Sequence, residues 1–351
     1  MDVILLLIVI WFAGSLRYRT AGPTATDLDR GTTTTINGLF ILLVLFGHFM
    51  TFIQMPSEFA RVTRLWMAVK GQLIVTTFLF FSGYGLSIQY QKRGPQYLKT
   101  FPKHRFLFLW GKFAVAITLY AIVAWLRGKH YSSWHLLGSY LGLTTIGNSA
   151  WYVFTILLMY LISYVAWRLL PQNCWGAIGI MALGSVLYIV IASAFLPEYY
   201  FCTVFCYVAG VVYGYYKIRL ENRICRNWIT YLSVGLITVL GFAASYVLCA
   251  NSIGLRRDVS YQIAAILFAF CFVLLAMRFS IHNRVLAYLG GPALFAIYVL
   301  QRLPMIWLQN TWLAKQPVLY FSGVLILTVI LGWLFDQGFN RGWKHLVLRR
   351  A

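Results

Sequence analysis

The chain has 351 residues, of which 61% are hydrophobic and 11% charged, and its mean hydropathy is +0.74. This composition excludes a soluble globular domain and indicates an integral membrane protein. The formal net charge is +21, but the basic residues border apolar segments in short loops, so we expect contact with anionic membrane lipids and no nucleic-acid partner.

Apolar segments long enough to cross about 30 Å of hydrocarbon recur along the whole chain. We therefore predict an all-α polytopic membrane protein with ten full transmembrane helices and a short N-terminal membrane helix at 3–16, which Asp2 and the lack of a basic n-region distinguish from a signal peptide. The ten full spans are predicted at 36–55, 66–89, 106–126, 150–169, 174–196, 200–216, 228–249, 259–277, 286–308 and 318–336. The predicted organisation is an N-terminal membrane helix and cytoplasmic linker (1–35), one transmembrane domain (36–337) and a basic cytoplasmic tail (338–351).

The distribution of Lys and Arg orients the predicted spans. The loops on one side, together with the tail, carry 19 basic residues and those on the other side carry 7. Because basic residues concentrate on the cytoplasmic side, the N-terminus is predicted outside and the C-terminus in the cytoplasm. Lys70, Lys112 and Arg302 are the basic residues that fall within predicted spans.

His48 lies in the first full span, in a run that is otherwise apolar. An ionisable side chain at membrane depth is costly and is therefore a functional candidate. At about 18 Å along the helix from Ile36, it is predicted near mid-membrane, somewhat toward the outer half. Thr32 to Thr35 precede this span, and a threonine hydroxyl is expected to cap it.

The six cysteines carry no metal-ligand spacing with His or acidic residues, so we expect no metal site and no disulfide framework. Four further segments carry polar or aromatic groups in a recognisable order: 80–86, 99–106, 149–154 and 289–301. Between the second and third of these lies an irregular stretch, 127–149, predicted on the outer side. A loop of this length with aromatic and polar residues is a place where an acceptor could be held.

With these segments the chain resembles the acyltransferase-3 family of membrane-embedded acyltransferases, many of which O-acetylate bacterial surface polysaccharides. The opening histidine of the family pattern corresponds to His48, the Ser-Gly stretch to Ser82-Gly83-Tyr84, the basic segment to 103–105, and the aromatic pair to Trp151-Tyr152. The chain departs from the pattern at Asn37, where the family has Arg, and at Gln301, where it has His. An amide can hydrogen-bond but supplies no positive charge.

The resemblance implies a ten-helix acyltransferase core in the bacterial cytoplasmic membrane. It would move an acyl group, acetyl by family preference, from cytoplasmic acyl-CoA to a hydroxyl of an extracytoplasmic or lipid-linked glycan of the cell envelope, without a metal. The predicted catalytic residues are His48, as general base, with Asn37 and Ser82 as orienting or oxyanion-binding groups. The predicted donor-binding residues are Lys103, Arg105, Lys112 and Tyr84, and the predicted acceptor-binding residues are Trp151, Tyr152, Gln301 and Arg302.

Two other functions are compatible with the same residues. A transporter or flippase also has many apolar spans with a few buried polar groups. A non-catalytic membrane sensor on the same scaffold would account for the departures at Asn37 and Gln301. Within the enzyme reading, direct transfer and a covalent acyl-histidine both remain open, and the sequence predicts no oligomeric state.

Overall fold

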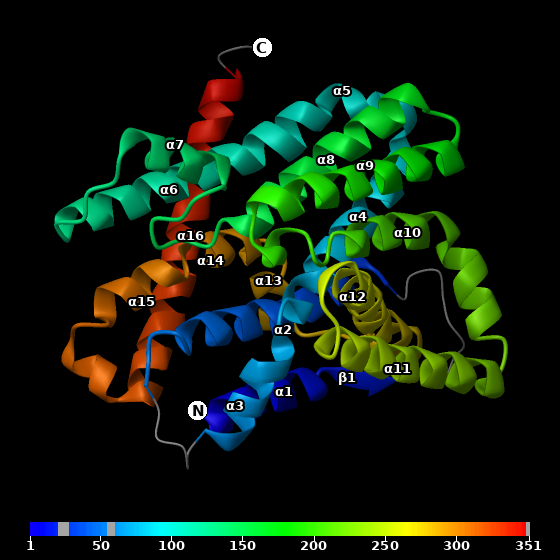
Figure 1. Cartoon of the computed structure of the whole chain (residues 1–351), viewed down its shortest axis with the longest axis horizontal. Helices are drawn as coiled ribbons and strands as arrows, with labels where there is room; N and C mark the ends of the chain where they lie inside the picture. The colour runs from blue at the N-terminus through cyan, green and yellow to red at the C-terminus, as the bar shows by residue number, and fades with distance from the viewer. Residues whose placement is uncertain (20–27, 55–59, 349–351) are drawn as a thin grey trace.

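The computed structural model describes residues 1–19, 28–54 and 60–348. Residues 20–27 of the predicted linker, 55 of the first full predicted span, 56–59 of the next loop and 349–351 of the predicted tail lie outside the described residues. The described chain is built almost entirely of helices (Figure 1), which confirms the predicted all-α polytopic class.

The helices, in chain order, are α1 (Asp2–Ala13), α2 (Arg30–Phe49), α3 (Arg61–Lys70), α4 (Leu73–Arg93), α5 (Tyr97–Phe101), α6 (Phe108–Leu126), α7 (Ser133–Leu141), α8 (Trp151–Leu169), α9 (Cys174–Phe195), α10 (Phe205–Ile224), α11 (Trp228–Ala250), α12 (Gly254–Arg278), α13 (Arg284–Leu289), α14 (Leu294–Leu300), α15 (Arg302–Leu308) and α16 (Pro317–Leu348). A π-helical segment (Pro102–Leu107) joins α5 to α6, and short 3-10 turns lie at Gly94–Gln96, Glu198–Tyr200 and Trp312–Lys315. The two strands are β1 (Leu16–Tyr18) and β2 (Phe279–Ile281).

By length and composition, the described residues contain eight helical segments able to cross a membrane, with two shorter apolar segments at Asp2–Ala13 and Leu294–Leu308. The predicted count of ten full spans is therefore not confirmed. Two predicted spans lie in one helical run, Leu73–Leu126, which bends at Gly94, where φ is +60°, so that α4 and α6 run in different directions (Figure 1). The span predicted at 286–308 is divided among α13, α14 and α15.

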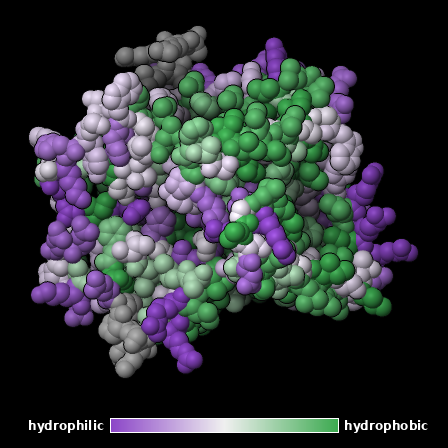
Figure 2. Space-filling model, viewed as in Figure 1, coloured by the Kyte–Doolittle hydropathy of each residue, from purple (hydrophilic) through white to green (hydrophobic). Residues whose placement is uncertain are grey.

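The outside of the molecule carries many exposed apolar side chains. Only 11% of the apolar window of α11 is buried, against 83% for α2, and Leu183 of α9 and Ile237 of α11 are among the exposed residues. Figure 2 shows broad hydrophobic areas, with hydrophilic residues gathered toward the left and right edges of the view. Exposed apolar surface of this extent is compatible with lipid and not with water, so the protein is a multi-pass integral membrane protein.

Helix α2 differs from its prediction at both ends. It begins at Arg30, six residues before the predicted start, because the Asp29 side chain accepts a hydrogen bond from the Thr32 N–H at 2.7 Å. The expected threonine cap is wrong: the four threonines lie within the helix, and Thr34, for example, donates to the Arg30 carbonyl. The helix ends at Phe49. His48 therefore lies near the end of α2, whereas the predicted span, 36–55, placed it well inside the helix.

The span predicted at 66–89 is also divided. α3 ends at Lys70, and α4 begins at Leu73 after a break in which the Gln72 N–H donates to the Tyr261 hydroxyl at 2.7 Å. A tyrosine on α12 thus fixes the place where the two halves of the predicted span part.

The predicted outer loop at 127–149 contains α7, whose first turn is capped by the Ser132 side chain.

Glycines allow two pairs of helices to approach closely. A Cβ at Gly83 of α4 would overlap the Tyr207 backbone of α10, and one at Gly210 of α10 would overlap the Phe80 carbonyl of α4. Gly38 of α2 would likewise overlap the backbone of α13. Small residues at such contacts let helix backbones pack at short range within a membrane. The helices that carry 82–84 (α4) and 214–219 (α10) are therefore packed closely together, and α2, which carries Asn37, is packed closely against α13.

A two-stranded antiparallel sheet ties the N-terminal region to the end of α12. Leu16 pairs with Ile281 and Tyr18 with Phe279, and the Arg19 N–H donates to the Arg278 carbonyl at 3.0 Å. These pairings place the end of α1 beside the loop that leads into α13. The sheet was not among the predicted elements because three residues are too few to give a periodic pattern.

Candidate functional site

Two cavities lie near opposite ends of α2. The larger, about 1110 Å³ in volume, is lined by the first turns of α2 and by residues of α4 and α10. The smaller, about 210 Å³, is lined by Phe52, just beyond the end of α2, by the end of α6, by Ile146 and Gly147, and by α15. We call them the large cavity and the small cavity.

The large cavity is rich in positive charge. Basic side chains from four parts of the chain line it, and the acidic residue that lines it is Asp29. These basic residues are Arg30, Lys92, Arg105, Lys217 and Arg219. Lys217 forms an ion pair with a carboxylate: its Nζ lies 3.8 Å from Glu221 Oε2 on the next turn of α10. The arrangement is suited to a ligand with several negative charges, such as phosphates.

Four of the predicted site residues meet in this cavity: Asn37, Ser82, Tyr84 and Arg105. Asn37 is 8% exposed, and its side-chain oxygen is buried without a hydrogen-bond partner among the described residues. Tyr84 donates to the Leu28 carbonyl at 2.9 Å, which ties the segment before α2 to α4. Arg105 Nε donates to the Tyr97 hydroxyl at 3.0 Å. The cavity thus combines basic side chains with an amide oxygen that has no hydrogen-bond partner within the described chain.

The two other predicted donor residues lie elsewhere. Lys103 is exposed on the π-helical segment. Lys112 is buried in α6 and forms an ion pair with Asp336 of α16, at 2.5 Å between Nζ and the carboxylate. Its ammonium also lies 5.0 Å from the centre of the Phe108 ring. Neither lysine lines the large cavity, and Lys112 has a structural partner that the sequence order does not reveal.

Ser82 connects the large cavity with the start of α8. Its side chain lies near Tyr152 and Tyr160 of that helix. Tyr152 is buried, with its ring 5.2 Å from that of Tyr298 in α14. Because Ser149 lies three residues before Tyr152, the polar groups at the start of α8 extend from Ser82 toward the other end of α2.

His48 meets Ser149 at that other end. The serine Oγ lies 3.2 Å from His48 Nδ1, and the imidazole is half-buried. Two cations, Lys70 and Arg302, lie close enough to interact electrostatically with the ring. Lys70 Nζ is 3.5 Å from the position that a Cβ would take at Gly47, the residue before the histidine. His48 therefore has a hydroxyl partner on one nitrogen and two positive charges nearby.

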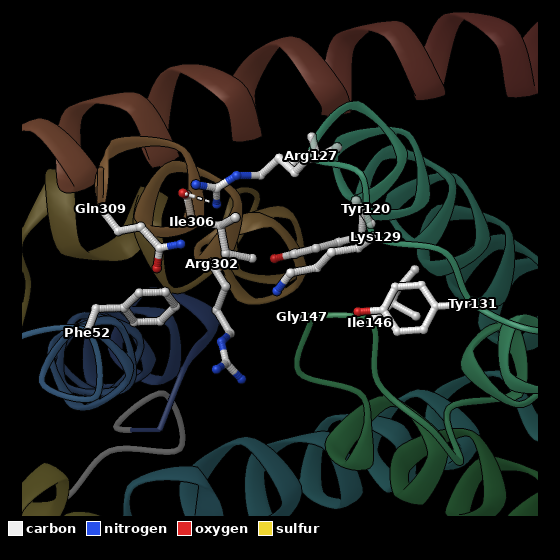
Figure 3. Close-up of a pocket in the computed structure, with 12 residues that line it drawn as sticks. Phe52, Tyr120, Arg127, Lys129, Tyr131, Ile146, Gly147, Arg302, Ile306 and Gln309 are labelled. Atoms are coloured by element: carbon white, nitrogen blue, oxygen red, sulfur yellow. Dashed lines mark hydrogen bonds between the residues drawn. The ribbon is translucent and has the colours of Figure 1, made fainter. Parts of the chain in front are cut away.

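The small cavity shares two features with the surroundings of this histidine: Arg302, and the segment that contains Ile146, Gly147 and Ser149. Arg302 lines the cavity together with Arg127, Lys129 and Tyr120. Figure 3 shows these side chains on α15, on the end of α6 and on the segment after it, with the Arg302 guanidinium pointing away from Arg127. Arg127 Nη1 donates to the Ile306 carbonyl at 2.6 Å. Positive charge therefore reaches the small cavity from two separate elements.

The predicted acceptor residues are not gathered at one point. Of these four, Arg302 lines the small cavity. Gln301 is 0% exposed and donates to the Tyr298 carbonyl at 3.1 Å, so it packs between α14 and α15. Trp151 is half-buried beside Tyr199, with ring centres 6.3 Å apart. The aromatic pair begins α8 directly after the serine that contacts His48.

The predicted catalytic residues are likewise separated. Asn37 and His48 are about three turns apart on α2, which places them on one helix face but about 16 Å apart along its axis. Asn37 therefore does not orient the imidazole. The residue that does contact it, Ser149, lies in a segment recognised from the sequence but without a predicted role. Lys70, the nearby cation, was recognisable as one of the few basic residues within predicted spans.

Within the described chain, no group of three or more His, Cys, Asp or Glu side chains could hold a metal ion. The cysteines are unpaired, and Cys202 and Cys206 are buried. The described groups around His48 are the Ser149 hydroxyl and two cations.

The family model described as the acyltransferase domain of the acyltransferase-3 family matches residues 36–337. No curated protein and no solved structure matches the chain. The matched region contains His48, Ser149, the small cavity and the larger part of the large cavity. With its apolar, multi-helical fold, the chain belongs to the acyltransferase-3 family and is a multi-pass membrane acyltransferase.

Proposed function

We propose that this protein moves an acyl group, acetyl by preference, from cytoplasmic acyl-CoA to a hydroxyl of an extracytoplasmic or lipid-linked glycan, with His48 as general base. The observation that carries the proposal is the contact of His48 with Ser149 beside the small cavity, at the end of α2 opposite the large basic cavity. The proposed setting is the bacterial cytoplasmic membrane, with the N-terminus outside, so that the large cavity faces the cytoplasm.

The large cavity is suited to the nucleotide end of the donor. Arg30, Arg105 and Arg219 present guanidinium groups, which bind phosphates through paired hydrogen bonds. From there a pantetheine arm, roughly as long as four to five extended residues or about 15 Å, would reach along α2. Asn37 and His48 are about 16 Å apart along the same axis. The two lengths agree, and we assign Asn37 and Ser82 to the path of the arm.

The transfer itself needs one proton acceptor and stabilisation of one oxyanion. His48 Nε2 takes the proton of the glycan hydroxyl as its oxygen attacks the thioester carbonyl, and the C–S bond then breaks to release the CoA thiolate. This requires the tautomer in which Nδ1–H donates to Ser149 Oγ. The proton held by His48 passes to the departing sulfur, so the enzyme returns to its starting state. Direct transfer of this kind needs no acyl-enzyme.

Lys70 and Arg302 supply the positive charge that Asn37 and Gln301 cannot. Both cations lie near His48, where negative charge develops on the attacked carbonyl. Fixed charges at such a point stabilise the transition state more than the ground state. The protein therefore needs no charged residue at position 37, and the departure from the family pattern is compatible with catalysis.

The test is His48→Ala, with His345→Ala near the end of α16 as the matched control. Protein in nanodiscs is given radiolabelled acetyl-CoA and envelope glycan from the producing cells. We expect His48→Ala to lower the transfer rate about 10²- to 10⁴-fold, and His345→Ala to leave it unchanged. Full transfer by folded, membrane-inserted His48→Ala would refute the assignment, and solute flux without CoA release would favour the transporter.

Two further readouts refine the mechanism. The wild-type rate should fall on acidification, because an imidazolium cannot accept the hydroxyl proton. Incubation with labelled acetyl-CoA and no acceptor should leave the protein unlabelled if transfer is direct. Stable label on the protein that disappears in His48→Ala would instead establish the acyl-histidine route.

A further inference from the structure

The small cavity has an excess of positive charge with no acidic counterpart. Arg127, Lys129 and Arg302 line it, and in the part of the chain that the structure describes no Asp or Glu does. The remaining lining groups are apolar or neutral, including Tyr120, Tyr131 and Gln309 (Figure 3). A concave site with three cations and no carboxylate attracts an anion.

Arg302 has a buried donor atom, Nε, without a hydrogen-bond partner among the described residues. Its guanidinium lies 5.6 Å from the centre of the Phe52 ring, which holds the group beside the cavity. Because a buried donor without a partner costs free energy, this nitrogen is a site at which a ligand oxygen gains a hydrogen bond that the protein does not provide.

Arg127 and Lys129 lie just beyond the end of α6, and the structure holds their side chains to different degrees. Arg127 is half-buried, and its bond to the Ile306 carbonyl fixes it against α15. Lys129 is exposed, but its backbone N–H donates to the Ala124 carbonyl at 2.9 Å, which anchors the turn that carries it. One cation is thus positioned in advance, and the other can adjust to the ligand.

The dimensions of the cavity limit what can occupy it. Its volume of about 210 Å³ is below the roughly 300–1000 Å³ of sites that enclose a drug-sized ligand, so it has room for one charged sugar unit and not for a chain. Ile146 and Gly147 form part of its wall, and Ser149, which contacts His48, follows two residues later. A group held here therefore lies against the segment that leads to the serine in contact with the imidazole.

We propose that the small cavity binds an anionic group of the acceptor, a carboxylate or phosphate ester on the sugar unit that is acylated, through Arg127, Lys129 and Arg302. This inference rests on the proposed function and names the class of acceptor for it. The anion fixes the sugar, and the fixed sugar presents its hydroxyl to His48. The enzyme is then selective for acidic glycans over neutral ones.

Binding is tested on the full-length protein in phosphatidylcholine nanodiscs, without acyl donor, so that the result does not depend on catalysis. The probes are methyl β-D-glucuronide and its neutral counterpart, methyl β-D-glucoside. We expect the glucuronide to bind at least tenfold more tightly, and the preference to weaken with salt. Equal binding of the two sugars, or binding of neither, overturns the proposal.

Variants then locate the binding site. Arg127→Gln and Lys129→Gln should each weaken glucuronide binding about tenfold, with glucoside binding unchanged. Arg256→Gln, which changes an exposed arginine at the start of α12, is the matched control and should keep wild-type affinity. His48→Ala should also bind the glucuronide normally, although it transfers no acyl group. Loss of affinity in Arg256→Gln equal to that in Lys129→Gln would mean a general charge effect and overturn the site.

The same anion chemistry could come from a lipid headgroup. The binding measurement is therefore repeated in nanodiscs that contain phosphatidylglycerol. Unchanged glucuronide affinity supports the acceptor assignment, whereas loss of glucuronide binding, restored by removing the anionic lipid, assigns the cavity to a headgroup and overturns it. If no transfer is detected with any acceptor but the binding pattern holds, the proposed reaction fails and the anion site stands.

Discussion

Replacing Ser149 with alanine tests whether its contact orients the imidazole that we propose as the general base. The contact is a hydrogen bond between neutral groups, with 3.2 Å between Oγ and Nδ1. Such a bond contributes about 0.5–1.5 kcal/mol, and each 1.36 kcal/mol of barrier is about tenfold in rate. Ser149→Ala should therefore lower kcat by roughly two- to tenfold, far less than the loss of the imidazole itself.

The assay is transfer of radiolabelled acetyl from acetyl-CoA to envelope glycan, with kcat and KM for the donor measured separately. Ser149→Thr keeps a hydroxyl and should restore much of the rate, while KM for the donor stays constant in both variants. Ser163→Ala is the control, because Ser163 is a buried serine of α8 that contacts Tyr207 at 2.8 Å and not His48. Wild-type kcat in Ser149→Ala would refute the orienting role, and a loss as large as that of His48→Ala would assign the serine to the chemistry.

Three other predictions concern an ion pair, a close helix contact and the large cavity. Lys112→Ala leaves the Asp336 carboxylate without its cation and should destabilise the protein by about 3–5 kcal/mol in thermal unfolding, whereas the double change Lys112→Met with Asp336→Leu should recover most of that loss. Gly210→Val forces α4 and α10 apart and should abolish folding on size-exclusion chromatography, while Gly179→Val, which faces open space, should not. Arg105→Gln removes a cation from the large cavity and should raise KM for acetyl-CoA about tenfold without changing glucuronide binding; a change in kcat alone would contradict this.

Hydropathy was sufficient to predict the membrane fold, because the signal for a long apolar helix is carried by every residue in it. It was insufficient where tertiary contacts decide the ends of helices. The spans predicted at 66–89 and 286–308 are apolar on average, yet Tyr261 binds the backbone between α3 and α4, and the second span is divided into three short helices. A hydropathy window averages over such breaks and does not detect them.

The candidate site was predictable to the extent that its chemistry is rare within the membrane. His48, Arg302 and Lys70 stand out because charged or titratable groups are uncommon there. Their partners do not stand out: Ser149 is an ordinary serine until the fold brings it to His48, and Lys112 reads as an anion-binding lysine until Asp336, more than two hundred positions away, is seen beside it. Pairing over long sequence distances was the missing information.

The spacing of Asn37 and His48 links the fold to the reaction. A separation of eleven residues keeps the two side chains on the same face of α2, but at depths that differ by about 16 Å. Two groups so placed cannot act on one atom, yet they can contact the two ends of one extended donor. In the proposed reaction, a charge at position 37 would act on the donor's path, and the charge that stabilises the reacting carbonyl would come from near position 48. Lys70 ends α3 and Arg302 begins α15. Both helices arise where a predicted span is broken, so the cations near the imidazole lie next to these breaks.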